Sequence, residues 1–125
     1  MNHTILICDD NDGDVYILLD SLKSAGLLFE SIRARDGVEA LKFLTSPARF
    51  DLVILDLRLP CLSGIDVMQT LEQRNLLPTC PIVILSSRLG RELAILSRFP
   101  TSAIVEKPMS LDGYEVVANS IAKLL

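Results

Sequence analysis

The sequence has no tryptophan, a single histidine and only three cysteines, and it lacks long apolar runs. Cys8, Cys61 and Cys80 are odd in number and widely spaced, so they indicate neither a disulfide framework nor a zinc site. A reducing compartment, the cytoplasm, fits such a set. No apolar run approaches the ~20 residues that cross a bilayer, and the first run ends at Asp9, too early for a signal peptide.

The positive charge expected of a nucleic-acid-binding protein is also missing. Twelve basic residues stand against sixteen acidic ones, the net charge is -4, and no basic cluster is present to meet a phosphate backbone. The sequence has no Walker-type glycine-rich loop and no cysteine and histidine pair for thiol catalysis. These absences argue against direct DNA or RNA binding and against those two kinds of chemistry.

What the chain does have is apolar material for one core. Its 125 residues are 50% hydrophobic, which predicts one domain over residues 1–125. Residues spaced by three or four, such as Val15, Leu18 and Leu22, follow each short apolar run and predict five helices. The alternation predicts a parallel sheet with helices on both faces. The expected strands are residues 4–8, 31–34, 51–56, 81–87 and 102–107.

Polar residues follow four of the five expected strands. Because the carboxyl ends of parallel strands meet at one edge of a sheet, these side chains are expected to lie together. Clustered carboxylates repel one another unless a cation lies among them, and Mg²⁺ prefers such oxygen ligands. An aspartate can also accept a phosphoryl group while a lysine and a hydroxyl stabilise its charge. The residues concerned are Asp9, Asp10, Asp56, Ser86 and Lys107.

The stretches "CDDND", "VILDLRLP", "VILSS" and "EKP" stand in this order at the strand ends. Together they resemble the receiver domain of two-component response regulators, and the resemblance covers the whole chain. It implies a flavodoxin-like α/β fold, with a doubly wound five-stranded parallel sheet in the order 2-1-3-4-5 and five helices. Within the family, the chain most resembles the single-domain members, which are similar to chemotaxis regulators and to phytochrome response regulators.

The resemblance assigns roles to the acidic residues. Asp56 takes the position of the phosphoacceptor, and Asp9 and Asp10 take those of the metal-binding acids. Mg²⁺ would be held by these two residues, by Asp56 and by the backbone carbonyl of Arg58, which leaves the side chain of Arg58 free.

The resemblance also assigns the residues that respond to the phosphoryl group. Ser86 takes the hydroxyl position, Lys107 takes the lysine position, and the bond before Pro108 is expected to be cis. The chain departs from the family at Ile104, where an aromatic ring usually swings inward when the hydroxyl residue moves. The chain therefore lacks the aromatic residue that, in the family, moves together with the hydroxyl residue.

Several neighbours of the site have plainer interpretations. Asp12 is expected to cap the first helix, and Asp14 to favour the positive end of its dipole. Arg58 and Arg88 occupy variable positions from which a cation would shield the phosphoryl group or bind an acid of a partner. Cys61 lies in the loop after Asp56, where a redox-sensing role is possible in principle but is not favoured by the sequence.

The expected function is that of a stand-alone response regulator, because the chain ends after the fifth helix. It would take a phosphoryl group from a histidine kinase or a histidine phosphotransfer protein, and would be no enzyme beyond catalysing its own phosphoryl transfer and hydrolysis. The family uses the face of helix 4, strand 5 and helix 5 for downstream partners and for dimers. Phosphorylation would add roughly two negative charges and bias a loop arrangement with two states.

Two other functions remain open from the sequence. A phosphorylation-independent interaction module with a receiver fold is suggested by Ile104, and it would bind its partner equally well with or without phosphate. A magnesium-dependent phosphatase with an aspartate nucleophile is the second alternative. The haloacid-dehalogenase family, however, needs a second aspartate two residues after the nucleophile, and Arg58 stands there.

Overall fold

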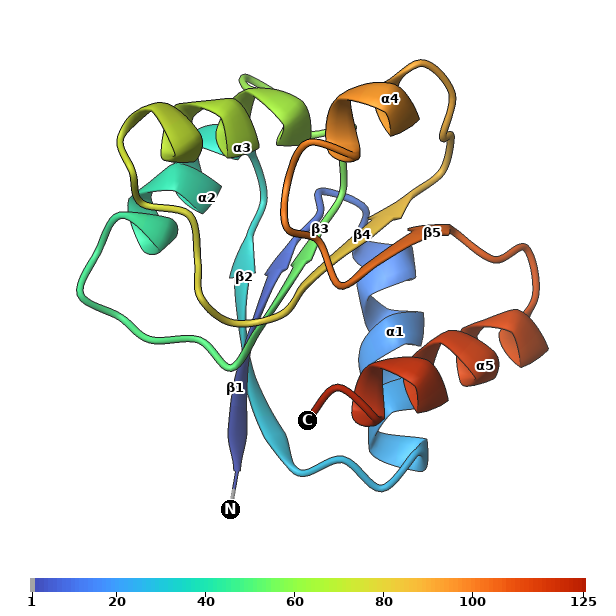
Figure 1. The fold of residues 1–125 in the computed structure, drawn as a ribbon. Helices are drawn as coiled ribbons and strands as arrows, with labels where there is room; N and C mark the ends of the chain where they lie inside the picture. The colour runs from blue at the N-terminus through green and yellow to red at the C-terminus, as the bar shows by residue number, and fades with distance from the viewer. Residues whose placement is uncertain (1) are drawn as a thin grey trace.

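The five apolar runs each form a strand and the five periodic segments each form a helix (Figure 1). This computed structural model describes residues 2–125. All strand pairs are parallel, and the order across the sheet is β2-β1-β3-β4-β5, so the predicted fold is confirmed. In chain order the elements are β1 (His3–Cys8), α1 (Asp12–Ser24), β2 (Phe29–Ala34), α2 (Gly37–Leu44), β3 (Leu52–Leu55), α3 (Gly64–Gln73), β4 (Ile82–Ser86), α4 (Glu92–Leu96), β5 (Ala103–Glu106) and α5 (Leu111–Ala122).

The sheet separates two cores. On β1, Leu6 contributes to the core under α2, α3 and α4, whereas its neighbours Ile5 and Ile7 contribute to the core under α1 and α5. Every residue of β3 and β4 is buried, as expected for strands that are covered on both faces. Figure 1 shows α1 and α5 together on one side of the sheet and the other three helices on the opposite side. No helix within residues 2–125 is long and apolar enough to cross a membrane.

The fourth helix is shorter than its sequence pattern predicts. Leu89, Leu93 and Leu96 have helical spacing, yet α4 contains only the five residues Glu92–Leu96. The side chain of Arg91, at the N-cap position, makes no capping hydrogen bond. The other four helices begin with a capping side chain, and these are Asn11, Asp36, Ser63 and Ser110. Since an uncapped helix start leaves backbone N–H groups without partners, α4 begins later and is held less firmly.

A glycine brings α3 against the end of β3. A Cβ at Gly64 would lie 2.6 Å from the carbonyl oxygen of Asp56 and 2.9 Å from the Cα of Leu57. Both are backbone atoms, so a side chain does not fit here unless the chain moves. The Gly64 N–H donates to the Leu57 carbonyl oxygen at 3.0 Å, and a capping box between Ser63 and Asp66 fixes the start of α3. The turn after Asp56 is therefore tightly determined.

Candidate functional site

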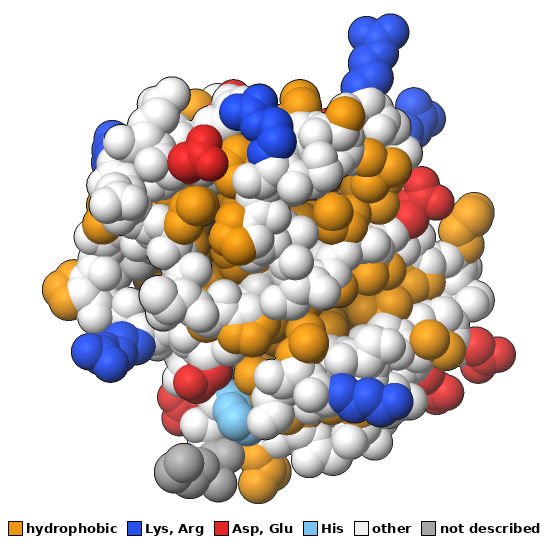
Figure 2. Space-filling view, in the orientation of Figure 1, with side chains coloured by type: hydrophobic (Ala, Val, Ile, Leu, Met, Phe, Trp, Pro, Cys, Tyr) orange, Lys and Arg blue, Asp and Glu red, His pale blue; other side chains and the backbone are white. Residues whose placement is uncertain are grey.

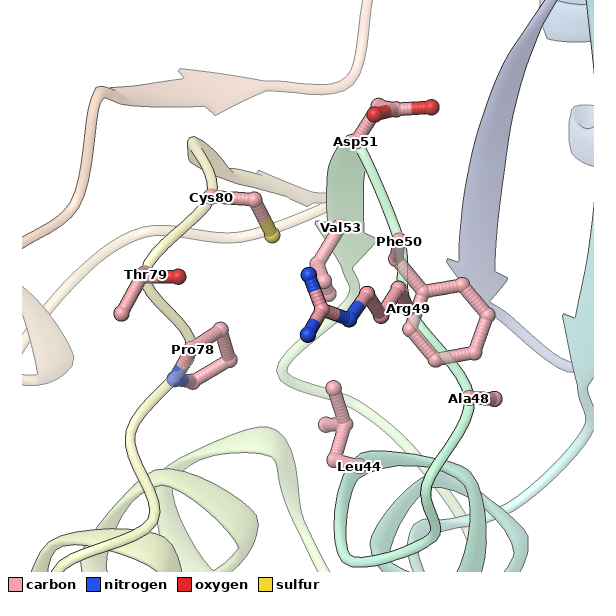
Figure 3. Close-up of a pocket in the computed structure, with 9 residues that line it drawn as sticks. All are labelled: Leu44, Ala48, Arg49, Phe50, Asp51, Val53, Pro78, Thr79 and Cys80. Carbon is pink, nitrogen blue, oxygen red and sulfur yellow. The ribbon is translucent and has the colours of Figure 1, made fainter.

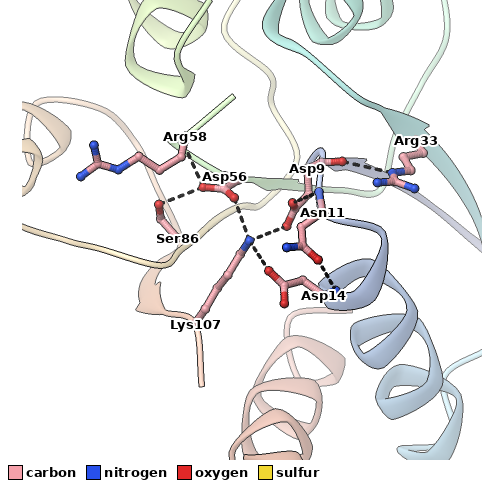
Figure 4. A network of polar contacts seen from close by, with 8 residues as sticks. All are labelled: Asp9, Asn11, Asp14, Arg33, Asp56, Arg58, Ser86 and Lys107. Atoms are coloured by element: carbon pink, nitrogen blue, oxygen red, sulfur yellow. Dashed lines mark hydrogen bonds and ion pairs between the residues drawn. The ribbon is translucent and has the colours of Figure 1, made fainter. Parts of the chain in front are cut away.

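The polar residues predicted to meet do so at the carboxyl edge of the sheet, around the ammonium group of Lys107 (Figure 4). Lys107 Nζ lies 2.9 Å from Asp9 Oδ2, at the end of β1, and 2.8 Å from Asp56 Oδ2, just after β3. It also lies 2.8 Å from Asp14 Oδ2, in the first turn of α1. The side chain of Lys107 is only 8% exposed. One buried cation thus joins three acids from three separate segments.

The electrostatics of this cluster favour further positive charge. Burial lowers the pKa of Lys107, but its hydrogen bonds to Asp14, Asp56 and Asp9 outweigh this effect, and the pKa is raised. Burial raises the pKa of Asp9 from 3.8, although its hydrogen bonds from the Asn11 N–H and from Lys107 lower it. One ammonium therefore leaves the buried negative charge only partly balanced.

Asp56 is held at both carboxylate oxygens. Oδ1 accepts hydrogen bonds from the backbone N–H of Arg58 and from the hydroxyl of Ser86, each at 2.9 Å, and Oδ2 accepts from Lys107. Ser86 is completely buried at the end of β4. Its carbonyl oxygen accepts from the Lys107 N–H at 2.8 Å, so the same pairing of β4 with β5 positions both groups. The carboxylate is consequently fixed in one orientation.

The acids at this edge are suitable ligands for a metal ion. One carboxylate oxygen from each of Asp9, Asp10 and Asp56 lies within 4.8 Å of the other two. Asp9 and Asp56 are buried and Asp10 is exposed, so the group opens to solvent on one side. A set of carboxylate oxygens fits a hard divalent cation. The metal-binding role of the Arg58 carbonyl stays a prediction.

The expectation that Asp12 caps the first helix is wrong. Asn11 is the cap, because its backbone is extended and its side chain accepts from the Asp14 N–H at 2.9 Å. Asp12 is the first helical residue and pairs with Arg33 at 2.6 Å and with Arg35 at 3.0 Å. These hydrogen bonds, first from Arg33 and then from Arg35, lower the pKa of Asp12.

Asp14 belongs to the site, although the sequence analysis gave it only a favourable interaction with the helix dipole. The signal that would have found it is its position in the first turn of a helix that starts directly after a strand end. Such a residue lies at the same edge of the sheet as Asp9 and Lys107. The spacing of apolar residues in α1 does not show which side chains of its first turn point towards β5.

The predicted cis bond before Pro108 is wrong, because the peptide bonds within residues 2–125 include no cis bond. Trans is the lower-energy isomer even before proline, and Lys107 reaches all three carboxylates with it. Ile104 is half-buried and packs on the core under α2, α3 and α4. It therefore fills interior space at the position where the family usually has its mobile ring.

The side chain of Arg58 has a partner in its own chain. Its Nη2 lies 3.0 Å from Glu92 Oε1, which links the turn after β3 to the start of α4. Arg88 is exposed beside them. Cys61 is exposed in the turn, whereas Cys8 is buried in the core and burial raises the pKa of its thiol.

A cavity of about 460 Å³ lies at the opposite edge, where β3 and β4 begin (Figure 3). Arg49 extends into it beside Phe50 and Leu44, and Cys80 lines its far side. It contains none of the residues that converge on Lys107, so it is separate from the acidic group at the carboxyl edge.

Comparison with known proteins agrees with this geometry. Residues 5–116 match the family described as the response regulator receiver domain. The chain belongs to this family. The polar-differentiation response regulator DivK of Brucella anthropi is 31% identical to it over 115 residues, which are 91% of each chain.

Two solved structures of response regulators are similar to this chain over nearly its whole length. The phosphorylated cyanobacterial phytochrome response regulator RcpA has a TM-score of 0.86 at 23% identity, covering 98% of this chain and 93% of its own, and shows the shared fold. The response regulator TrrA of Thermotoga maritima, in complex with Mg²⁺-BeF, has a TM-score of 0.75 at 28% identity and covers both chains completely.

Other relatives of the receiver domain are longer than this chain. It spans 35% of the transcriptional regulator PhoP of Bacillus subtilis, at 39% identity over 88 residues. It spans 50% of YrkP of the same organism, at 33% identity over 124 residues. The chain therefore spans between a third and a half of the length of these two relatives.

Proposed function

We propose that residues 1–125 form a single phosphorylation-dependent receiver domain that accepts a phosphoryl group on Asp56 from a histidine kinase or a histidine phosphotransfer protein. The observation that carries this proposal is the pair of groups on the Asp56 carboxylate. Lys107 at 2.8 Å and Ser86 at 2.9 Å are the cation and the hydroxyl that transferred phosphoryl oxygens require. Three free cysteines agree with a cytoplasmic location.

The chemistry follows from these positions. An oxygen of Asp56 attacks the phosphorus of a phosphohistidine, an acyl P–O bond forms, and the P–N bond breaks. The imidazole keeps the electron pair and takes a proton. Lys107 neutralises charge on the equatorial oxygens, and Ser86 turns its hydroxyl towards one of them. Later attack by water releases inorganic phosphate and restores the carboxylate, so the domain catalyses only its own transfer and hydrolysis.

Mg²⁺ fits the acids beside Asp56. Asp9, Asp10 and Asp56 would hold it, with the backbone carbonyl of Arg58 as the further protein ligand, and it would neutralise charge that Lys107 leaves unbalanced. The TrrA complex with Mg²⁺-BeF supports this choice of metal, because a phosphoryl mimic and magnesium bind together in that relative. Buried Asp9 would gain a second positive neighbour.

The signal would leave through the face made by α4, β5 and α5, towards a downstream protein or a second copy of the chain. Between β5 and α5, the part of this face away from α4, lies a groove of about 380 Å³ that is almost entirely apolar. Figure 2 shows hydrophobic side chains gathered on this side of the molecule, with charged ones around them. The groove is lined by Val83, Ala103, Val105, Val116, Val117, Ser120, Ile121 and Leu124.

A phosphorylation-independent interaction module is the second candidate, and Ile104 is the observation that favours it. This side chain is packed against the core, where a mobile aromatic ring would report the movement of Ser86. The module would show the same hydrogen exchange along α4 and β5 with and without beryllofluoride, whereas a switch would show a difference. The haloacid-dehalogenase type of phosphatase stays disfavoured, since Arg58 occupies the acid position.

The deciding experiment is intact-mass measurement after incubation with acetyl phosphate and Mg²⁺, because a small donor bypasses the kinase. We expect one phosphoryl group on the wild type, none on Asp56→Asn and none when the metal is chelated. Wild-type protein that stays unmodified while folded and magnesium-bound would favour the interaction module. A phosphoryl group retained by Asp56→Asn would place the acceptor elsewhere.

A further inference from the structure

The contact between Asp14 and Lys107 joins residues 93 positions apart and is as short as the contact that Lys107 makes with Asp56. Its geometry is fixed from both ends. The Asp14 N–H is held by the capping side chain of Asn11 at 2.9 Å, and the Lys107 N–H is held by the Ser86 carbonyl at 2.8 Å. Neither residue reaches the other through a long, loose surface contact.

Asp14 differs from the other two partners of Lys107 in one respect. Asp9 and Asp56 belong to the oxygen group that suits a divalent cation, and Asp14 does not. A metal ion would draw both of those carboxylates towards itself. Phosphorylation would also convert the Asp56 carboxylate into an acyl phosphate, so that its negative charge would lie on the phosphoryl oxygens.

During the reaction proposed above, the metal ion and the phosphoryl group therefore compete with Lys107 for two of its three carboxylate partners, Asp9 and Asp56. An ammonium group has three N–H donors and no acceptor, so a lysine that loses two carboxylates before the phosphoryl oxygens are in place becomes free to rotate into solvent. Asp14 is the carboxylate left to it. Its side chain is 32% exposed, at the rim of the site, and lies 2.8 Å from the ammonium.

We propose that Asp14 is a positioning residue that keeps Lys107 directed at Asp56 while the metal and the phosphoryl group engage the other acids. This inference rests on the proposed phosphoryl transfer, and it concerns which residue holds the lysine in place for that reaction. A purely structural Asp14 would instead tie α1 to the segment after β5 and affect stability alone.

The first test is the rate of phosphorylation by acetyl phosphate for four variants and the wild type. Asp14→Asn is expected to slow the reaction about tenfold, the size of one lost hydrogen bond to a charged group. Asp20→Asn removes the same charge from an exposed position on the same helix and is expected to match the wild type. In the background of Lys107→Met, adding Asp14→Asn is expected to change nothing further.

Three outcomes would overturn the proposal. The first is an Asp14→Asn rate equal to that of the wild type. The second is a double variant that falls below Lys107→Met by the same factor, because Asp14 would then act through its field and not through the lysine. The third is an equal loss of rate in Asp20→Asn, which would assign the effect to net charge.

A second measurement does not depend on phosphorylation and separates this inference from the proposed function. Hydrogen exchange of the Lys107 ammonium with water can be followed by NMR in the presence of Mg²⁺ alone. We expect it to be about tenfold faster in Asp14→Asn than in the wild type and unchanged in Asp20→Asn. If the wild type accepts no phosphoryl group, this difference still supports the contact as the anchor of Lys107, and its absence refutes it.

Discussion

The carboxyl edge of the sheet has two halves that are held in very different ways. The acidic half comprises the end of β1, the start of α1, Asp56 and Lys107. Its side chains are 8% exposed at Asp9, 4% at Asp56 and 8% at Lys107. The α4 half comprises the segment from Arg88 to Leu96. Its helix has five residues, no capping side chain and a single buried residue, Leu96.

The difference shows where a receiver domain can change shape at low cost. Buried ion pairs and a capped helix of 13 residues leave the acidic half little freedom. The α4 half is joined to the turn after Asp56 by the ion pair of Arg58 with Glu92, in which Arg58 is 51% exposed. Segments that move during signalling come from the less stable parts of a fold.

Replacing Lys107 with methionine should break the acidic half. Its three carboxylates would lose their shared cation, and removing one member of a buried ion pair costs about 3 kcal/mol. Urea unfolding at neutral pH should show this loss in metal-free protein and a smaller loss with millimolar Mg²⁺, since the metal replaces part of the missing charge. An equal loss under both conditions would contradict the view that the metal and the lysine neutralise the same acids.

Two glycines allow the halves to be compared with the same substitution. Gly64→Ala places a Cβ against the backbone of Asp56 and Leu57 and should lower the free energy of unfolding by about 1–3 kcal/mol. Gly90→Ala, in the α4 half, meets only the Glu92 carboxylate at 3.8 Å and should stay within about 0.5 kcal/mol. Similar losses at both positions in urea unfolding would remove the contrast in packing.

The sequence predicted the acidic half better than the α4 half, for a physical reason. The fold and the strand ends follow from apolar runs and turns, which are local signals. Asp9, Asp56, Ser86 and Lys107 follow from the strand ends, because a parallel sheet brings all carboxyl ends to one edge. The topology of the sheet alone therefore brings these four residues together.

The errors fall where side chains from different segments compete. Asn11 and Asp12 both have side chains that can cap a helix, and the extended backbone at Asn11 decides in favour of Asn11. The role of Asp14 depends on a partner 93 residues away, which no local pattern indicates. Leucine spacing does not show whether a helix start is capped, so it does not indicate where α4 begins.

Removing the ion pair between Arg58 and Glu92 should loosen the α4 half with little loss of overall stability. A double-mutant cycle with Arg58→Gln and Glu92→Gln should give a small favourable coupling that weakens in high salt, because solvent screens the pair. Amide hydrogen exchange in α4 should become faster while that in α1 stays the same. Faster exchange in both helices would mean that the two halves open together.

Substitution of Asp12 should cause the smallest loss of stability. Its side chain is 76% exposed at the outer side of the acidic half, where it contacts Arg33 and Arg35. The hydrogen bonds from these arginines lower the folded-state pKa of Asp12, so its stabilising effect is complete above the ordinary value of 3.8 and is lost as the pH falls through the lowered pKa. Asp12→Asn should therefore melt slightly earlier than the wild type at neutral pH, and the difference should vanish in acid and in high salt. Arg35→Gln, which leaves the Arg33 contact with the Asp9 carbonyl intact, should show the same trend. A difference that persists in acid would mean that Asp12 stabilises the start of α1 through something other than its charge.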